Sequence, residues 1–362
     1  MTQDRPRVTY VIDDLGHGGA QRQLFHTVRA LDGAANLSVV VLSDLTEPWG
    51  PRIHALGVPV ETIPRRTSFD ATRALALAQK FRALNTGIAH AMLDAADGYT
   101  FLAARARRIP AVLSLRSDRL TTTGGRARML GWMMRNASAV TTNSRAGRDY
   151  LLGRIGVRAE RVHLVPNIID LPPDASPPAA DGGPVIGAVG RLVALKRFEA
   201  VIDALVVVRR AIPDARVVVI GDGPARPGLE NLARREGVAN AVEFAGAVDD
   251  ATARMSAFAC LVVASAHEGL PNAALEALAR GVPVVAVPAG DLPRIIQDGV
   301  TGVLARDASP ESLADAIGRA LSIPTLRESA RREGPRLIRD EFSAERARAG
   351  LIDLYSRLPP SR

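Results

Sequence analysis

Two glutamates, Glu268 and Glu276, lie eight positions apart across a predicted strand-to-helix turn. The apolar run 259–265 predicts a buried strand, and Pro271 with Asn272 supplies a proline and a capping side chain for the start of the next helix. Glu268 is therefore expected in the loop at the carboxyl end of that strand, where a side chain can reach a ligand.

Glu276 belongs to the predicted helix 272–280, which is apolar on nearly every other face. We therefore expect this helix to be buried all round. A buried ionised carboxylate needs hydrogen-bond donors, and the hydroxyl groups of a ligand would supply them. The alternative is that Glu276 reaches solvent or pairs with an arginine.

A pair of cations follows the predicted strand Val185–Val189. Arg191 lies at the end of the strand, and Lys196 comes five residues later, just before a predicted helix at 198–211. Both side chains can converge on one anion and stabilise a leaving diphosphate without a metal. The alternative is a solvated loop with ordinary charges.

A glycine-rich turn connects the predicted strand Val8–Asp13 to the predicted helix Ala20–Leu31. Gly18 and Gly19 would let the backbone approach a phosphate at the helix N-terminus. Gln21 stands where a dinucleotide-binding pattern has its third glycine or alanine, so the turn does not match that pattern. The alternative is a turn needed only for tight packing.

Strands and amphipathic helices alternate along the chain, which predicts parallel α/β domains. The proline-rich stretch 170–184 has no periodicity and is predicted to be a linker. We expect two Rossmann-like, doubly wound domains, 1–169 and 185–342, with a last helix in 343–362 that crosses back to the first. Because ligands bind beyond the carboxyl ends of parallel strands, we expect the active site in the cleft between the domains.

The composition is that of a cytoplasmic protein. The chain has one cysteine, Cys260, so it cannot form an intramolecular disulfide. This cysteine lies in a predicted apolar strand, which favours a core role for its thiol and a reducing compartment. The start of the chain has no apolar signal region, and no run approaches the roughly 18 apolar residues of a membrane-spanning helix. The net charge of +8 arises in residues 1–175, with 23 basic against 15 acidic residues, whereas 176–362 has 23 of each.

Such a positive region attracts nucleic acid, acidic lipids or a phosphorylated substrate. Aromatic residues make up 4% of the chain and no nucleic-acid-binding motif occurs, so nucleic acid is not an expected partner. The predicted helix 126–136 combines arginines with apolar residues, as in helices that lie on an anionic membrane surface. The alternative is that its apolar residues are core. The residues concerned are Arg126, Arg128, Arg135, Met129, Leu130, Trp132, Met133 and Met134.

Six short motifs, spread over nearly the whole chain, resemble those of the retaining GT-B glycosyltransferases of family 4. The paired glutamates and the Arg/Lys pair make the resemblance specific for the family but not for the sugar. In chain order the motifs are Gly18-Gly19-Ala-Gln-Arg22, Pro166-Asn167, Gly190-Arg191 with Lys196, Gly221-Asp-Gly-Pro224, Glu268-Gly-Leu-Pro271 with Glu276, and Asp298-Gly-Val-Thr-Gly302.

The resemblance implies the GT-B fold, with a nucleotide-sugar donor held mainly by the second domain. Arg191 and Lys196 would hold the diphosphate, and the backbone of Gly19 would approach it from the first domain. Glu276 would bind the ribose hydroxyls. The donor sugar and its phosphate would contact Glu268 and the backbone of Gly269 and Leu270. The family needs no divalent metal, and none of the six histidines pairs into a ligand cluster.

The expected reaction is a front-face displacement that retains the anomeric configuration, with UDP favoured over GDP. The acceptor would be a saccharide or a lipid-linked saccharide near Arg116 or Arg119, in polysaccharide or glycolipid biosynthesis, with the enzyme peripheral at the inner face of the membrane. Arg116 stands where many relatives have a histidine, and Arg294 where many have a glutamate. An inverting enzyme would need an acceptor-side base, for which only His17 and His90 stand out.

Two other functions are compatible with these motifs. One is a nucleotide-sugar epimerase or hydrolase with the same architecture, which product analysis would distinguish. The other is a non-catalytic nucleotide-sugar-binding protein, which would show no turnover.

Overall fold

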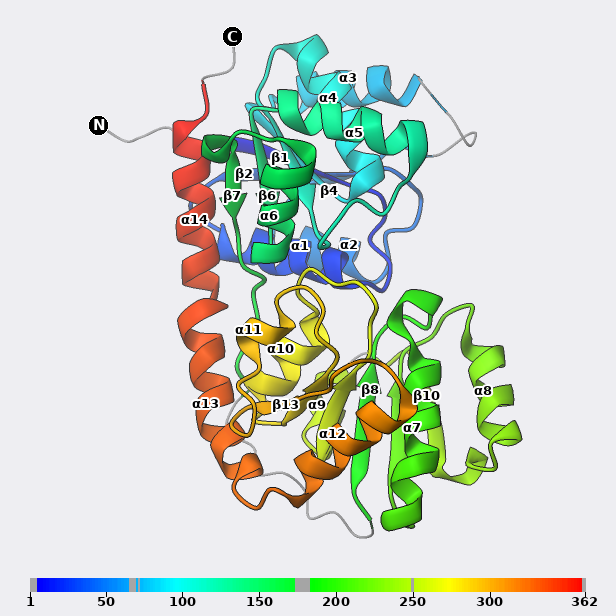
Figure 1. Cartoon of the computed structure of the whole chain (residues 1–362). Helices are drawn as coiled ribbons and strands as arrows, with labels where there is room; N and C mark the ends of the chain where they lie inside the picture. The colour runs from blue at the N-terminus through cyan, green and yellow to red at the C-terminus, as the bar shows by residue number, and fades with distance from the viewer. Residues whose placement is uncertain (1–4, 65–69, 71, 173–182, 249–250, 360–362) are drawn as a thin grey trace. The chain divides into compact units, whose positions relative to one another are not determined.

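The computed structural model describes residues 5–64, 70, 72–172, 183–248 and 251–359 (Figure 1). By its internal contacts the chain divides into two compact units. The first unit comprises Met1–Ile168 together with Ala344–Arg362, and the second comprises Ile169–Ser343. Most of the predicted linker, 173–182, lies outside the described residues.

The first unit is built on a parallel sheet with the strand order β3-β2-β1-β4-β5-β6-β7. Its strands are β1 Arg7–Ile12, β2 Asn36–Val41, β3 Val60–Thr62, β4 Ile88–Met92, β5 Ala111–Leu115, β6 Ala139–Thr142 and β7 Val162–Leu164. Its helices are α1 Gly19–Ala30, α2 Trp49–His54, α3 Thr72–Ala83, α4 Asp94–Arg107, α5 Gly124–Asn136, α6 Arg145–Tyr150 and α14 Ala344–Arg357.

Successive residues of β1 point to opposite faces of this sheet and enter two different cores. Tyr10 lies in the core covered by α1 and α14, whereas Val11 lies in the core covered by α3, α4 and α5. The last helix is fixed to the sheet by polar contacts as well, because the Tyr355 hydroxyl bonds the Tyr10 hydroxyl (2.6 Å) and Nδ1 of His90 (2.8 Å). Helix α14 is thus part of the first unit.

The second unit has a smaller parallel sheet, with the order β10-β9-β8-β11-β12-β13. Its strands are β8 Val185–Val189, β9 Arg216–Ile220, β10 Val242–Gly246, β11 Cys260–Val263, β12 Val284–Ala286 and β13 Gly302–Leu304. Its helices are α7 Phe198–Ala211, α8 Arg226–Arg235, α9 Ala251–Met255, α10 Asn272–Ala279, α11 Leu292–Ile295, α12 Pro310–Ser322 and α13 Leu326–Glu341.

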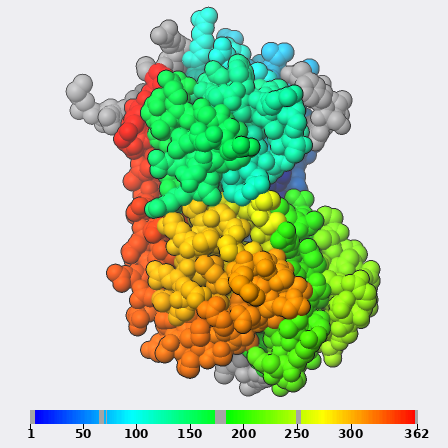
Figure 2. Space-filling model, in the orientation of Figure 1, coloured from blue at the N-terminus to red at the C-terminus, as the bar shows by residue number. Residues whose placement is uncertain are grey.

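Helices cover both faces of this sheet too. Cys260 packs in the core beneath α7, α8 and α12, and the next residue, Leu261, packs in the core beneath α10 and α13. In the space-filling view, α12 is the orange segment on the visible face of this unit (Figure 2). Cys260 is fully buried, and burial raises the pKa of its thiol to about 12, so its predicted role as core filler is confirmed.

The two predicted doubly wound parallel sheets are confirmed, and most element boundaries agree with the predictions within a few residues. The helix expected at 145–153 differs, because α6 ends at Tyr150 and the chain continues as a π-helical turn over Leu151–Ile155. In the described part of the chain, every helix is too short or too polar to cross a bilayer.

Candidate active site

The carboxyl edge of the second sheet holds most of the predicted site residues. Strand β8 lies between β9 and β11, so the chain turns one way after β8 and the other way after β11. Such a reversal of strand order leaves a crevice at the carboxyl edge, where open α/β sheets bind ligands. The loops 190–197 and 264–271 begin at this point.

Lys196 and Glu268 meet at this crevice. The Nζ atom of Lys196 donates to Oε1 of Glu268, and the two side chains are 27% and 15% exposed. A backbone hydrogen bond from Ala266 N to Leu195 O (2.9 Å) joins the same two loops. Because the ion pair is only partly exposed, solvent screens it less than a surface pair, and it fixes the ammonium group at the switch point.

Arg191 is the second residue after β8 and is exposed, with no ion pair to another described residue. The preceding Gly190 has φ +150° and donates its N–H to Ile220 O (2.9 Å). A Cβ on Gly221 would lie 2.0 Å from Gly190 O, so only glycine lets the β8 and β9 loops approach so closely. Arg191 thus lies in the loop after β8, and the structure does not bond it to Lys196 or Glu268.

Helix α10 carries Glu276, and the structure confirms that it is buried nearly all round. Glu276 is 6% exposed, so the alternative in which its carboxylate reaches solvent is wrong. The helix begins at Asn272 with Pro271 in the N-cap position, so the predicted capping by Asn272 is wrong as well. A proline pre-sets the backbone at the start of the helix without supplying a capping oxygen.

The turn Glu268-Gly269-Leu270 packs against a second loop that the sequence analysis did not assign to the site. Gly290 has φ +52°, and a Cβ there would lie 2.0 Å from Glu268 O and 2.4 Å from Gly269 O. Asp291 N donates to Gly269 O (3.0 Å). The signal available in the sequence was a glycine shortly after a buried strand, which often marks a close approach of two backbones.

The side chains of Leu270 and Arg294 are both engaged in contacts within the second unit. The side chain of Leu270 is buried in the core below the turn, and the contact of its backbone with the nucleotide sugar stays a prediction. Arg294, which stands where relatives have a glutamate, donates to Glu341 Oε2 at 2.6 Å.

In the first unit, Gly18 and Gly19 lie at the start of α1. Gly18 is the N-cap residue in an extended conformation, and both glycines are exposed. Asp14 stabilises the turn, because its Oδ1 accepts from Gly16 N and from Nε2 of Gln21, both at 2.9 Å. The N-terminal N–H groups of α1 are therefore presented by a preformed turn.

The two histidines considered as acceptor-side bases differ. His90 is buried and bonded to Tyr355 and to Thr141 Oγ1 (3.2 Å), and burial lowers its pKa to about 3. It is a neutral structural group at physiological pH. His17 is exposed in the glycine turn. Among the described residues, no three His, Cys, Asp or Glu side chains come together as a metal site would require.

Two protein-family models match the chain. The model described as glycosyl transferases group 1 matches residues 183–322, and the model described as glycosyltransferase family 4 matches residues 17–172. The chain belongs to the group 1 glycosyltransferases. This places the Lys196–Glu268 crevice and the glycine turn of α1 in the two halves of one transferase.

Several curated relatives of this glycosyltransferase are moderately similar. The 2-deoxystreptamine glucosyltransferase of Streptomyces kanamyceticus is 28% identical over 63% of this chain and 62% of its own length. The alpha-D-kanosaminyltransferase of the same organism is 29% identical over 74% of this chain and 77% of its own.

Solved structures show the same fold. HepE of Anabaena, in complex with UDP and glucose, superposes with a TM-score of 0.86 at 20% identity, over 98% of this chain and all of that one. The sucrose-phosphate synthase of Thermosynechococcus elongatus has a TM-score of 0.81 at 19% identity, over 97% and 98% of the two chains. The glycosyltransferase therefore has the predicted GT-B fold. The location of its active site between the domains stays a prediction.

Proposed function

We propose that this glycosyltransferase moves a sugar from UDP to a saccharide or lipid-linked acceptor with retention of configuration, in polysaccharide or glycolipid biosynthesis. One observation carries the proposal. The Lys196–Glu268 ion pair and the buried carboxylate of Glu276 lie on loops and a helix that leave one edge of the second sheet. The ammonium group of Lys196 suits the diphosphate of a nucleotide sugar, and the carboxylate of Glu276, on the helix after the same edge, suits the ribose hydroxyl groups.

In the proposed reaction, Arg191 and Lys196 bind the diphosphate and stabilise the negative charge that grows on it. The bond between the anomeric carbon and the phosphate oxygen breaks as the acceptor oxygen bonds that carbon from the same face. The departing phosphate oxygen accepts the proton of the acceptor hydroxyl, so no protein base is needed. The neutral, fully bonded His90 is consistent with this, because it has no free nitrogen to act as a base.

The choice of UDP is supported by a structural neighbour, since HepE was solved with UDP and with UDP-glucose. A GDP-mannose-dependent mannosyltransferase of Mycolicibacterium smegmatis is among the relatives, at 31% identity over 52% of this chain. The nucleotide is therefore best tested directly. We propose that the reaction needs no metal, since two side-chain cations can take over the role of a divalent ion at a diphosphate.

The test is calorimetry with UDP and GDP in EDTA, followed by turnover of a panel of UDP- and GDP-sugars. We expect UDP to bind without a metal, and proton NMR to show the same anomeric configuration in donor and product. An inverted product would contradict retention, and loss of activity in EDTA would contradict metal independence. Epimerised or free sugar without an acceptor would favour the epimerase or hydrolase alternative.

We also propose that the first unit binds an anionic membrane surface through the exposed sides of α4 and α5. In Figure 2 the segments from α4 to α6, coloured cyan to green, form one face of this unit. Leu102, Met129 and Trp132 on α4 and α5 are 47–49% exposed. The core alternative holds only for the other apolar residues of α5, which are Leu130, Met133 and Met134.

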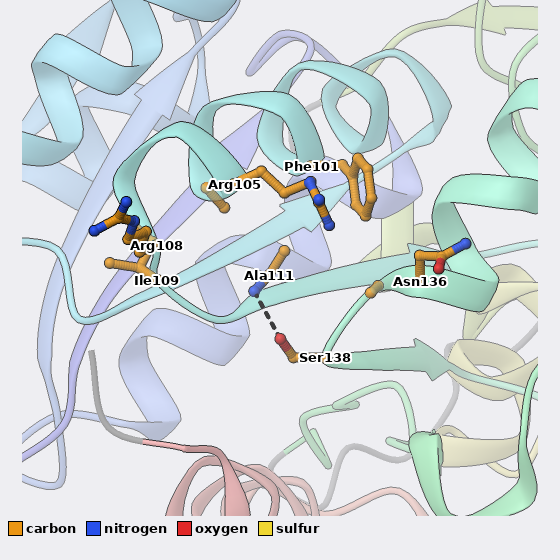
Figure 3. Close-up of a pocket in the computed structure, with 9 residues that line it drawn as sticks. Phe101, Arg105, Arg108, Ile109, Ala111, Asn136 and Ser138 are labelled. Carbon is orange, nitrogen blue, oxygen red and sulfur yellow. Dashed lines mark hydrogen bonds between the residues drawn. The ribbon is translucent and has the colours of Figure 1, made fainter. Parts of the chain in front are cut away.

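A cavity of about 410 Å³ lies between the ends of these two helices (Figure 3). Arg105 and Arg108 line it from the end of α4, and Asn136 lines it from the end of α5. The Phe101 ring at its edge contacts the exposed Trp132 ring, with 5.6 Å between the ring centres. Guanidinium groups beside half-exposed apolar side chains suit the headgroup region of an anionic bilayer.

A further inference from the structure

Arg116 lies directly after β5, at the carboxyl edge of the first sheet, and its guanidinium group has few partners. Its closest contacts are weak, with NH1 3.5 Å from Asn167 Oδ1 and NH2 3.9 Å from Met92 Sδ. Its Nε atom is buried without any hydrogen bond. A guanidinium group has five N–H donors, so most of the hydrogen-bonding capacity of Arg116 is unused.

No carboxylate of the described residues lies within ion-pair distance of Arg116, although three aspartates lie on the same edge of the sheet. Each of them is engaged elsewhere. Asp97 Oδ1 and Asp13 Oδ1 accept from backbone N–H groups at 2.9 and 2.7 Å, and Asp94 accepts from the Thr121 hydroxyl at 2.5 Å.

None of these three carboxyl groups pairs with the positive charge of Arg116. Burial raises the pKa of Asp97 well above its usual range, which favours the neutral form of this carboxyl group. Burial lowers the pKa of Arg116 only to about 10, so the guanidinium group remains charged. Arg116 is partly buried, so water screens its charge only in part, and a ligand of opposite charge would stabilise it.

Two asparagines complete the surroundings of Arg116. Because Leu115 pairs with Thr142 in the sheet, Arg116 and Asn143 occupy equivalent positions beyond β5 and β6. Asn143 donates one N–H to Asn167 Oδ1 (3.1 Å), and its own Oδ1 is buried without a partner. The second N–H of Asn143 is therefore available to a ligand oxygen beside the guanidinium group, whereas its Oδ1 can only accept a hydrogen bond.

We propose that Arg116 and Asn143 bind an anionic oxygen group, a phosphate or a carboxylate, of the acceptor. A neutral sugar hydroxyl would accept a hydrogen bond but would leave the charge uncompensated, whereas an oxyanion meets both needs and matches the planar guanidinium fork. The site lies at the edge of the sheet where ligands of such folds bind. That the anion belongs to the acceptor rests on the proposed function, in which the donor diphosphate is held by the second unit.

The test is a titration of inorganic phosphate and, separately, of acetate into the full chain saturated with UDP, so that the donor diphosphate site is already filled. Calorimetry is used for the wild type, Arg116→Gln and Arg116→Lys. We expect phosphate or acetate to bind the wild type. The same anion should bind Arg116→Gln at least tenfold more weakly and should bind Arg116→Lys with intermediate affinity. Stronger binding of phosphate would indicate a phosphorylated acceptor, and stronger binding of acetate would indicate a carboxylated one.

Arg107→Gln is the matched control, because Arg107 is an exposed arginine of the same unit, in the last turn of α4. Its anion affinity is expected to stay within twofold of the wild type. Binding of neither anion to the wild type, or equal binding to wild type and Arg116→Gln, would overturn the proposal. UDP affinity is measured first on the same samples. If UDP does not bind but an anion still binds through Arg116, the proposed function is contradicted while the anion site at Arg116 is supported.

Melting temperatures in phosphate-free buffer provide a second readout. Arg116→Met removes an uncompensated charge, so its melting temperature should equal or exceed that of the wild type. A clear fall in melting temperature would show that Arg116 is needed for the fold, and would overturn its assignment as a ligand group.

Discussion

Lys196 donates to the carboxylate of Glu268 across the switch point of the second sheet, although the two residues lie 72 positions apart in the chain. The carboxylate holds the ammonium group in a defined place before any ligand is present. It also competes with a diphosphate for that ammonium group. We therefore expect Glu268 to orient Lys196 in the free enzyme and to share it with the donor after binding.

Replacing either cation of the crevice should slow transfer. Arg191→Ala and Lys196→Ala should each lower kcat by about a hundredfold or more, because each removes a donor that stabilises the leaving diphosphate. Arg210→Ala, at the opposite end of α7 from Lys196, is the charge-matched control and should be near normal. Near-normal turnover of either site variant at saturating donor, or rescue by added Mg²⁺, would contradict the assigned role.

Glu276→Gln should weaken UDP binding while leaving the fold intact. Loss of a charge-assisted hydrogen bond to the ribose should cost about 1.5–3 kcal/mol, which is roughly a 10- to 150-fold weaker Kd. Calorimetry on the variant and on Glu311→Gln, an exposed glutamate in the first turn of α12, gives the comparison. An unchanged Kd would return Glu276 to a purely structural role.

Gly290→Ala should damage both stability and turnover, because the new methyl group would press on the carbonyl oxygens of Glu268 and Gly269. Gly299→Ala is the matched control, since Gly299 also has a positive φ, +73°, but a Cβ added there would meet nothing within 4 Å. We expect Gly299→Ala to cost about 1 kcal/mol and Gly290→Ala at least about 2 kcal/mol more. Urea unfolding measures both, and equal losses would show that the close approach is unimportant.

Asp13 should make stability depend on pH in a predictable direction. Burial raises its pKa from 3.8 to about 6, so between these values the native state holds a proton that the unfolded state has released. The contribution of Asp13 to the free energy of unfolding is therefore fully present below pH 3.8 and is lost as the pH rises through 6. Asp13→Asn should thus raise the free energy of unfolding by about 1–3 kcal/mol at pH 8 and change it little at pH 4.

Urea unfolding at several pH values checks this, with Asp32→Asn as an exposed control. A gain that is the same at pH 4 and pH 8 would show that the charge of Asp13 is not the cause.

Binding to vesicles should depend on the arginines of α4 and α5. Changing Arg105, Arg126 and Arg128 to Gln should weaken co-sedimentation with anionic vesicles by roughly two orders of magnitude, at about 1 kcal/mol for each charge. Arg135 is left unchanged because it already donates to Ile155 O (2.9 Å). A variant with Arg210, Arg235 and Arg336 changed to Gln loses the same charge from the second unit. Equal binding to anionic and neutral vesicles, or equal loss in both variants, would favour a soluble acceptor.

Local patterns were sufficient to predict the two sheets and to place Glu268 after a strand and Glu276 in a buried helix. They could not predict the Lys196–Glu268 ion pair, because its formation depends on β8 and β11 being neighbours, and periodicity does not give strand order. The packing of Gly290 under Glu268 was missed for the same reason. Sequence patterns also show where a cation is, as at Arg116, but not whether a counter-ion lies beside it.

Tyr355 and its helix α14 complete the first unit, yet they follow the whole second unit in the chain. During synthesis on a ribosome, the second unit can therefore finish its core before the first unit receives its last helix. Until then Tyr10 and His90 lack the hydroxyl that bonds them both. The first half of the sequence should thus fold poorly when expressed alone, and should recover when residues 344–357 are supplied as a peptide or fused behind it.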